Sequence, residues 1–527
     1  MLKINKLWKN IASKWFLLIT IILSLGYLIL TLPAFFDHDH LLFNLEPYPD
    51  GLYYSLSARN LVLGKGLNLV YQANSLPLNQ PPIYSLVLAL GYLISNRPES
   101  FYLINLGLGL ISLEFILLSA RVLTKQKILI LFSGLFYLSH LYLVWVPSLP
   151  MTENIVLTML TILVYFGINK YSKTKLLIAM FLSLILVLTK FSLIVTTLFF
   201  LLWFGLWFYK QSNLKLRLLT ILSIILGFVV INIYFISVNH SLFEMGKLII
   251  DQLMGNHIAE IRFYDLAYLL ANLSFYLKML SGGETRFLWM GFPLTSVASV
   301  LSLVTSIAFL FVKKKVNYQT TFLILTLVSF FVLMGIFYVA DARYTFYAII
   351  PIILLIIITL NQIQNKYKLC FLMTMILLIQ IISQLSFAKK IITDNWLGRS
   401  TAWQYQAIKH FNQQFSSSEM ELLITTLPLF LIDAYQTSSY SIYPLSQNQE
   451  FLSKEQLVWG RDINYQDLPG YYQQLISHGK AVYITNAYIT HQQEVIKDFE
   501  NYKQKFTLEL VSSGCDNACN IYQLKLK

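Results

Sequence analysis

Long apolar runs alternate with short polar segments along most of the chain. Each run predicts a membrane-spanning helix, because a helix needs about 20 apolar residues to cross the hydrocarbon core of a bilayer. Beyond about residue 388, Gln, Ser, Tyr and Asn replace the Leu and Ile runs. We therefore expect an all-α polytopic membrane domain over 1–387, followed by a small α/β domain over 388–527. The candidate spans are 15–33, 81–95, 101–119, 127–146, 152–169, 175–189, 191–209, 216–237, 289–312, 319–339, 344–360 and 368–387.

The C-terminal region shows shorter patterns. Thr401 to Phe415 has helical spacing, whereas Glu421 to Thr425 and Ala481 to Thr485 look like short buried strands. Phe506 to Leu526 resembles a final hairpin around the sequence SSGCDNACN. Cys515 and Cys519 lie at its turn, and an oxidising exterior compartment favours a disulfide between them over a zinc site.

Basic residues are sorted along the chain in a way that predicts its topology. Six short segments together hold nearly half of the 39 Lys and Arg residues and no acidic residue. Such segments face the cytoplasm, so the N-terminus is expected inside and the C-terminal domain outside. The segments are 1–14, 120–127, 169–176, 210–217, 313–318 and 361–368.

The same topology places the loops 34–80 and 238–288 on the exterior. It allows one net crossing between 81 and 119, although two apolar runs lie there, so one of them is expected to be shallow, tilted or re-entrant. The total is about 11–13 crossings. The run 15–33 is predicted to be a first anchor, because it is too long for the apolar h-region of a typical signal peptide and lacks a small-residue cleavage site.

Composition excludes several classes of protein. With 56% hydrophobic and 12% charged residues, the chain is expected to be a multi-pass protein of the plasma (inner) membrane rather than a soluble one. The net charge of +13 follows from the cytoplasmic segments, so it does not indicate a nucleic-acid partner. The motifs GxxxxGK[ST], HExxH, GxSxG and a GxGxxG after a strand are absent, which leaves ATP-driven transport, zinc proteolysis and nicotinamide chemistry without support.

No cofactor is required by these patterns, and a divalent cation is the one candidate. The alternating stretch Asp37-His38-Asp39-His40 offers carboxylate and imidazole ligands. A short polar tip beside a span is more often a solvated loop.

One ordered set of residues suggests chemistry on the exterior face. It starts at Asp50 in the sequence YPDGLYYSLSARNLVLGKG, where a helical run ends at Gly64-Lys65-Gly66, and continues with QPPIYSLVLALGYL. Three later segments follow at predicted span ends: SLPMTENIVLTML with Glu153, LTKFSLIV with Lys190, and DARYTFYAIIP with Arg343.

This order resembles the GT-C class of membrane glycosyltransferases that use polyprenyl-phosphate-linked sugars, in particular the protein O-mannosyltransferase and aminoarabinose transferase families. The resemblance covers roughly residues 15–360. It implies a GT-C fold, a polyprenyl-phosphate-linked sugar donor among membrane lipids, and a lipid, glycan or protein acceptor. The sequence departs from the family where Glu153 replaces the usual Asp, where Gln80 precedes the Pro-Pro pair, and where Phe191-Ser192 follows Lys190.

The resemblance also assigns candidate roles. Asp50 is the expected general base in an inverting displacement, with Glu153 as a second catalytic carboxylate. Lys190 and Arg343, with Arg262 and Arg286 as weaker candidates, would stabilise the charge on the departing phosphate. The residues expected to support the substrate site are Tyr53, Tyr54, Pro81, Pro82, Tyr84 and Tyr344.

Structural alternatives remain for each assignment. Asp50 is also a good helix N-cap, and Glu153 suits the first turn of a helix because of the helix dipole. Lys190 could extend to the headgroups between two spans, and Arg343 could pair with Asp341 on the surface.

Two other functions also stay open from the sequence. One is a polysaccharide polymerase or ligase, and the other is a lipid-linked glycan flippase or transporter. The sugar, the acceptor and the role of Glu114, a charged residue inside an apolar run, are not determined by the sequence.

Overall fold

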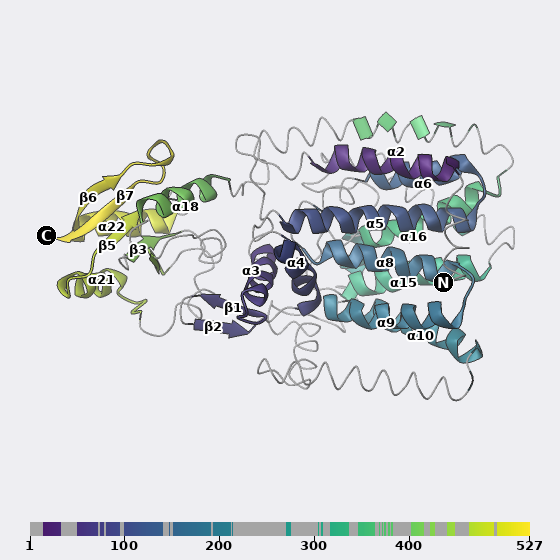
Figure 1. The fold of residues 1–527 in the computed structure, drawn as a ribbon, viewed down its shortest axis with the longest axis horizontal. Helices are drawn as coiled ribbons and strands as arrows, with labels where there is room; N and C mark the ends of the chain where they lie inside the picture. The colour runs from purple at the N-terminus through teal and green to yellow at the C-terminus, as the bar shows by residue number, and fades with distance from the viewer. Residues whose placement is uncertain are drawn as a thin grey trace. The chain divides into compact units, whose positions relative to one another are not determined.

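Within its described residues, the computed structural model is mostly helical and has a five-stranded mixed sheet and a two-stranded antiparallel sheet (Figure 1). The residues that the structure describes are 14–32, 50–71, 74–77, 81–94, 100–140, 147, 151–190, 193–211, 213, 270–275, 304, 307–308, 317–336, 346–363, 368, 371–372, 374–375, 378–379, 381–382, 402–415, 422–426, 440–447, 463–487, 489 and 493–527.

Contacts divide the chain into two compact units. Unit 1 contains Met1–Phe35, Pro81–Tyr84 and Tyr102–Asp394, and unit 2 contains Phe36–Gln80, Ser85–Phe101 and Asn395–Lys527. Unit 2 therefore combines the first predicted exterior loop with the C-terminal region. The division predicted from sequence at 387/388 follows composition alone, and it stays a prediction.

The described helices of unit 1 coincide with the apolar runs of the sequence. They are α2 (Lys14–Thr31), α5 (Ser100–Leu123, whose first two residues belong to unit 2), α6 (Lys127–Leu138), α8 (Glu153–Ile168), α9 (Lys173–Thr189), α10 (Ile194–Gln211), α15 (Tyr318–Ile336) and α16 (Phe346–Leu360).

Helix α8 lies at the centre of this unit. It packs against α9, α15 and α16, while α10 contacts both α9 and α15, and α6 contacts α2 and α16 (Figure 1). Most side chains of α8 are buried, including its polar ones. A helix that is apolar and buried all round is typical of the interior of a helical membrane protein.

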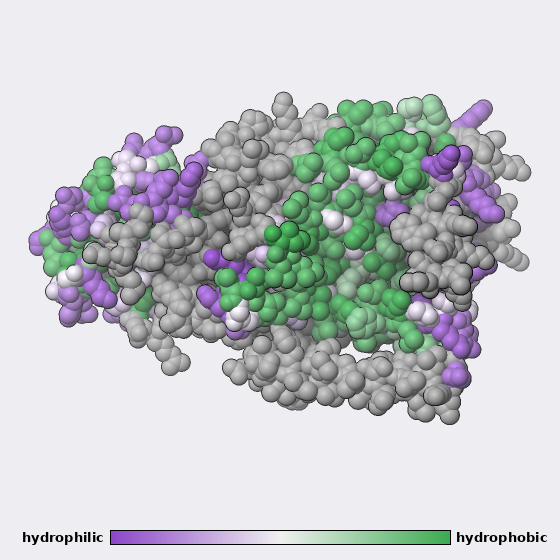
Figure 2. All heavy atoms as spheres, viewed as in Figure 1, coloured by the Kyte–Doolittle hydropathy of each residue, from purple (hydrophilic) through white to green (hydrophobic). Residues whose placement is uncertain are grey.

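Apolar side chains gather on the described surface of unit 1. Exposed Leu, Ile and Phe side chains cover the visible face of these helices (Figure 2). Among the described residues, α2 and α5 are long and apolar enough to cross a membrane, and α4 (Pro82–Ile94), α6, α8, α15 and α16 include shorter apolar helical stretches. The exposed apolar side chains and the apolar helices together support the prediction that this is a membrane protein, because an apolar surface of this kind suits contact with lipid.

Two helices occupy the region in which the sequence allows one net crossing. Helix α4 has 13 residues, whereas α5 has 24. At 1.5 Å per residue, α4 is about 20 Å long, which is shorter than the roughly 30 Å of a bilayer core. Of the two, only α5 has the length of a span.

The N-terminal part of unit 2 consists of one helix and one hairpin. Helix α3 (Asp50–Val62) is followed by the antiparallel strands β1 (Asn68–Tyr71) and β2 (Asn74–Pro77). Gly64 and Gly66 both have positive φ, which stops the helix and turns the chain toward β1. The side chain of Asn60 donates to the carbonyl of Asn68 at 2.8 Å and fastens this turn.

The C-terminal part of unit 2 is an α/β domain. Its five-stranded sheet has the order β4-β3-β5-β7-β6, and helices α18 (Ala402–Gln414), α21 (Leu468–Ser477) and α22 (Gln493–Lys505) pack against it. The neighbours β3-β4 and β3-β5 are parallel, whereas β5-β7 and β6-β7 are antiparallel. The strands are β3 (Leu422–Thr425), β4 (Ser441–Pro444), β5 (Val482–Thr485), β6 (Phe506–Ser512) and β7 (Ile521–Leu526).

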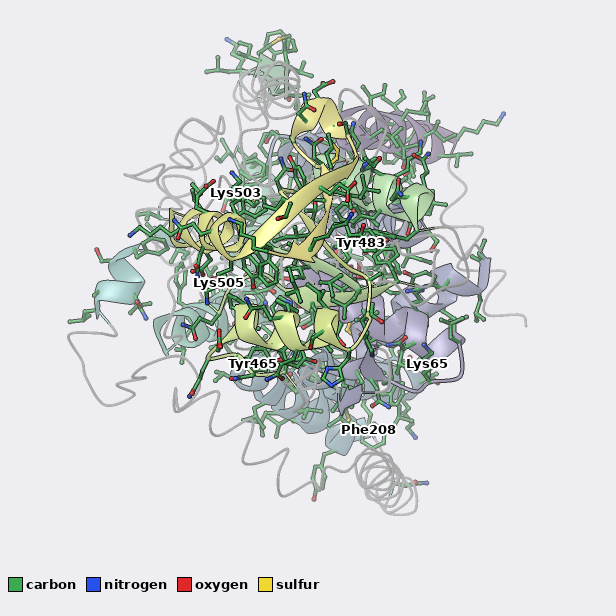
Figure 3. The ribbon with its side chains drawn as sticks, turned by 90° about the vertical axis from the view of Figure 1, so that its left-hand side faces the viewer. Lys65, Phe208, Tyr465, Tyr483, Lys503 and Lys505 are labelled. Carbon is green, nitrogen blue, oxygen red and sulfur yellow. A yellow bond between two sulfur atoms is a disulfide. The ribbon has the colours of Figure 1, made fainter. Side chains whose placement is uncertain are left out.

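Most elements of this domain lie where the sequence predicts them. The helix near 401–415, the strands near 421–425 and 481–485, and the final hairpin are confirmed. Cys515 and Cys519 form a disulfide at the hairpin turn. Tyr483 lies on β5, and Lys503 and Lys505 belong to the last turn of α22 (Figure 3).

Candidate functional site

Glu153 and Lys190 are placed by the ends of two neighbouring helices. Glu153 is the first residue of α8, where a negative charge interacts favourably with the helix dipole. Lys190 follows the last residue of α9 in an extended conformation, and its backbone N–H donates to the carbonyl of Leu186 at 3.1 Å. Because α8 and α9 pack against each other and are joined by a short turn, the start of one meets the end of the other.

The two side chains form a buried ion pair. Lys190 Nζ donates to Glu153 Oε1, and the side chains are 15% and 2% exposed, respectively. Thr152 Oγ1 also donates to Glu153 Oε2, at 3.3 Å. Lys190 therefore directs its ammonium group at a carboxylate within the protein. Burying ionisable groups is costly, so a buried pair of this kind is a functional-site candidate.

A tyrosine from the Pro-Pro motif joins this pair. Tyr84 lies in the first turn of α4, and its hydroxyl donates to Asn105 Oδ1 of α5 at 2.9 Å. The same hydroxyl interacts with the side chain of Asn154 and with the charge of Glu153. Tyr84, Asn105, Glu153 and Asn154 are all buried.

Asn105 and Asn154 are functional candidates that the sequence alone does not reveal. Each is an uncharged polar residue in the first two turns of a largely apolar helix, and such residues usually satisfy a local backbone group. Asn154 does so in part, since its Nδ2 donates to the carbonyl of Met151 at 3.1 Å. The signal that could have found them is their position near the starts of α5 and α8, where Asn154 directly follows Glu153.

The polar contacts continue one turn deeper. Thr158 Oγ1 lies 3.0 Å from the carbonyl of Asn154, 2.9 Å from the carbonyl of Leu108 and 3.0 Å from Ser112 Oγ. These contacts join α8 to α5. They fix α8 in rotation, and with it the direction in which Glu153 and Asn154 point.

The other predicted site residues are on α3, at the start of α4 and on α5, or lie outside the described residues. Asp50 is the first residue of α3, and Ser55 Oγ donates to the carbonyl of Gly51 in that helix at 2.8 Å. Tyr54 is buried in α3, and Pro81 and Pro82 are buried at the start of α4. Glu114 is half-buried on α5. The predicted residues that lie outside the described part of the chain are Arg262, Arg286, Arg343, Tyr344, and the side chains of Asp50 and Tyr53.

The described part of the chain contains no cluster of side chains that could hold a metal ion. No group of three or more His, Cys, Asp or Glu side chains gathers there. The stretch Asp37-His38-Asp39-His40 lies outside the described residues.

Comparison with known proteins gives a match at the level of structure. No protein-family model and no curated protein matches the sequence. Two crystal structures of ArnT from Cupriavidus metallidurans, one in the apo state and one bound to undecaprenyl phosphate, each match with a TM-score of 0.60 and 12% sequence identity. The match covers 97% of this chain and 98% of ArnT. This protein therefore has the GT-C-like fold of ArnT over nearly its whole length.

Proposed function

We propose that this chain is an integral-membrane glycosyltransferase that moves a sugar from a polyprenyl-phosphate donor to an acceptor. Its likeness to ArnT, an aminoarabinose transferase that has been crystallised with undecaprenyl phosphate, supports this proposal. The positive-inside pattern favours about 11–13 crossings, with the reaction and the C-terminal domain on the exterior face of the plasma (inner) membrane.

The observation that carries the proposal is the buried pair of Glu153 and Lys190 beside Tyr84. All three residues come from the ordered set that resembles the GT-C families, and in the structure they interact at adjoining helix ends. A lysine held in a water-poor setting is suited to stabilise a phosphate, because electrostatic interactions strengthen where water is excluded.

The chemistry needs few groups because the lipid phosphate is already a leaving group. A carboxylate must remove a proton from the acceptor, and cations must stabilise the charge on the departing phosphate. We assign the first task to Asp50 and the second to Lys190, with Arg343, Arg262 and Arg286 as further candidates. Direct attack by the acceptor would invert the configuration of the anomeric carbon.

Transfer of sugar in membranes tests the proposal. Membranes that contain the wild type are incubated with a panel of radiolabelled polyprenyl-phosphate sugars, beside Asp50→Asn and the control Asp516→Asn, which changes an exposed carboxylate in the disulfide loop of the C-terminal domain. We expect transfer by the wild type and the control and a loss of about 10²–10⁴-fold in Asp50→Asn, the usual contribution of a general base. Full turnover by Asp50→Asn would refute the assignment of Asp50. Failure of the wild type with every donor would instead favour a polymerase or a flippase.

A further inference from the structure

The ammonium group proposed to bind the donor phosphate already has an anionic partner. Lys190 Nζ contacts Glu153 Oε1, and the Glu153 side chain is almost completely buried. A phosphate oxygen placed at the same ammonium would therefore lie beside a carboxylate. Two anions that share one buried site repel each other, and the weaker acid of the two takes up a proton.

We propose that Glu153 is a positioning residue that holds Lys190 in place of the donor phosphate, and that it takes up one proton when the phosphate binds. This inference rests on the proposed function. It gives Glu153 a role different from that of a second catalytic carboxylate.

Charge balance makes the step explicit. The ion pair has no net charge, whereas a lipid phosphodiester brings one negative charge to it. Uptake of a proton from the buffer by the Glu153 carboxylate restores neutrality at the site and leaves the conjugate base of the buffer in solution. Lys190 Nζ can then transfer its hydrogen bond from Glu153 to a phosphate oxygen. A carboxyl group without a cation in an apolar interior ordinarily becomes neutral rather than staying charged.

At neutral pH, both charged and uncharged titratable groups lie on α8 and on the helices that contact it. Within the described residues, Lys190 and Tyr84 interact with Glu153, and a tyrosine is uncharged at this pH. Lys173 and Lys175 lie at the opposite end of α9, and Tyr318 of α15 donates to the carbonyl of Ile168, at the opposite end of α8. The remaining titratable residues on α8 or on the helices that contact it are Tyr165 on α8, Tyr347 on α16, and Tyr102, Glu114 and Arg121 on α5.

The proposal fixes the sign of a pH dependence. Because binding takes up a proton, affinity for the phosphate should be highest at low pH and should fall as the pH rises, by at most about tenfold per pH unit for one proton. Glu153→Gln keeps the shape of the side chain but removes its charge and its titration. The variant should therefore bind phosphate more tightly than the wild type at pH 8, with an affinity that is flat between pH 6 and 8.

A binding measurement separates this proposal from the function on which it rests. The probe is undecaprenyl methyl phosphate, a diester that carries one negative charge throughout this pH range. Isothermal titration calorimetry on the full-length protein in detergent, repeated in HEPES and Tris buffers of different ionisation enthalpy, counts the protons taken up. Glu114→Gln, which changes a carboxylate of α5 that has no role in the proposal, is the matched control.

We expect an uptake of close to one proton by the wild type and by Glu114→Gln at pH 7.5, and none by Glu153→Gln. Binding without proton uptake by the wild type would overturn the inference while the proposed function stands. No binding by the wild type would count against the proposed function itself, and the inference would fall with it. The wild-type proton count decides the question even if Glu153→Gln does not fold. Turnover adds a second readout. A lower KM for the donor in Glu153→Gln supports the proposal that Glu153 holds Lys190 in place of the phosphate. A 10²-fold or larger loss of kcat with an unchanged KM would show that Glu153 is catalytic instead.

Discussion

Removing one partner of the Glu153–Lys190 pair should destabilise the protein far more than removing both. Lys190→Met keeps most of the side-chain stem and deletes the charge. The carboxylate of Glu153, only 2% exposed, then loses its cation. Breaking a buried ion pair in this way typically costs about 3–5 kcal/mol, whereas replacing both partners by neutral groups is often neutral or stabilising.

Protonation of the carboxylate sets an upper limit to this cost. A glutamate has an ordinary pKa of about 4.3, so neutralising it requires about 5 kcal/mol at pH 8 but only about 1 kcal/mol at pH 5. We therefore expect Lys190→Met to lose about 3–5 kcal/mol of unfolding free energy at pH 8 and about 1 kcal/mol at pH 5. The double variant Glu153→Gln/Lys190→Met should lie within about 1 kcal/mol of the wild type at both pH values.

Equilibrium unfolding in mixed detergent micelles measures these differences. The wild type, the two single variants and the double variant form a thermodynamic cycle, and Lys173→Met at the exposed far end of α9 is the control, with an expected change below about 0.5 kcal/mol. The reasoning is refuted if Lys190→Met unfolds like this control at pH 8, or if the double variant is no more stable than Lys190→Met alone.

Three further predictions follow from individual contacts. A β-carbon at Gly167 would collide with the ring of Phe322, which packs against Phe199, Phe200 and Trp203, so Gly167→Ala should lower the unfolding free energy by about 1–3 kcal/mol in the same assay. Tyr84→Phe removes the hydroxyl that bonds to Asn105 and should cost about 1–2 kcal/mol there, toward the upper end for a hydrogen bond between membrane helices. Partial burial lowers the pKa of His410 on α18, so the stability that the neutral imidazole contributes above about pH 6.5 should be lost as the pH falls below 6.5. Hydrogen-exchange protection of 402–415, corrected for intrinsic rates, should therefore drop between about pH 7.5 and 5.5 in the wild type but not in His410→Gln.

Each of these predictions has a contrasting result. Gly205→Ala places its methyl group in open space, so an equal loss in both glycine variants would contradict the steric argument at Gly167. A Tyr84→Phe protein as stable as the wild type would show that the hydrogen bond from Tyr84 to Asn105 contributes nothing to stability. A fall in protection that persists in His410→Gln would assign the pH effect to another group.

The helices of unit 1 were predictable because length and apolarity suffice to identify them. Their ends were less so. The apolar run 127–146 predicts one span, but α6 ends at Leu138, and Ser139 caps it with a backbone hydrogen bond to the carbonyl of Leu135. The sequence stays apolar beyond Leu138, so hydrophobicity alone does not mark the end of the helix. It cannot show where backbone geometry changes.

Among the candidate site residues, the charged Glu153 and Lys190 and the motif residue Tyr84 were predictable from the sequence, whereas the amides Asn105 and Asn154 were not. Glu153 and Lys190 are conspicuous beside apolar spans, and their proximity follows from two adjacent antiparallel helices. Asn105 looks like an ordinary polar residue in a span, because the Tyr84 hydroxyl to which it bonds is 21 residues away and belongs to another helix. Strand β4 was missed as well, since its short polar-flanked sequence has no pattern of its own and pairs with β3 only in the folded sheet.

The central claim is that this chain transfers sugar from a polyprenyl phosphate with Lys190 at the phosphate. It is tested most directly by supplying purified protein in liposomes with a panel of polyprenyl-phosphate sugars and measuring the release of polyprenyl phosphate together with the labelled product, for the wild type, Lys190→Met and Lys173→Met. We predict equal formation of both products by the wild type and Lys173→Met, and a loss of at least about 100-fold in Lys190→Met, the effect of removing one preorganised group that stabilises transition-state charge. Full transfer by a folded Lys190→Met protein, or no release of polyprenyl phosphate from any donor by the wild type, would contradict the claim.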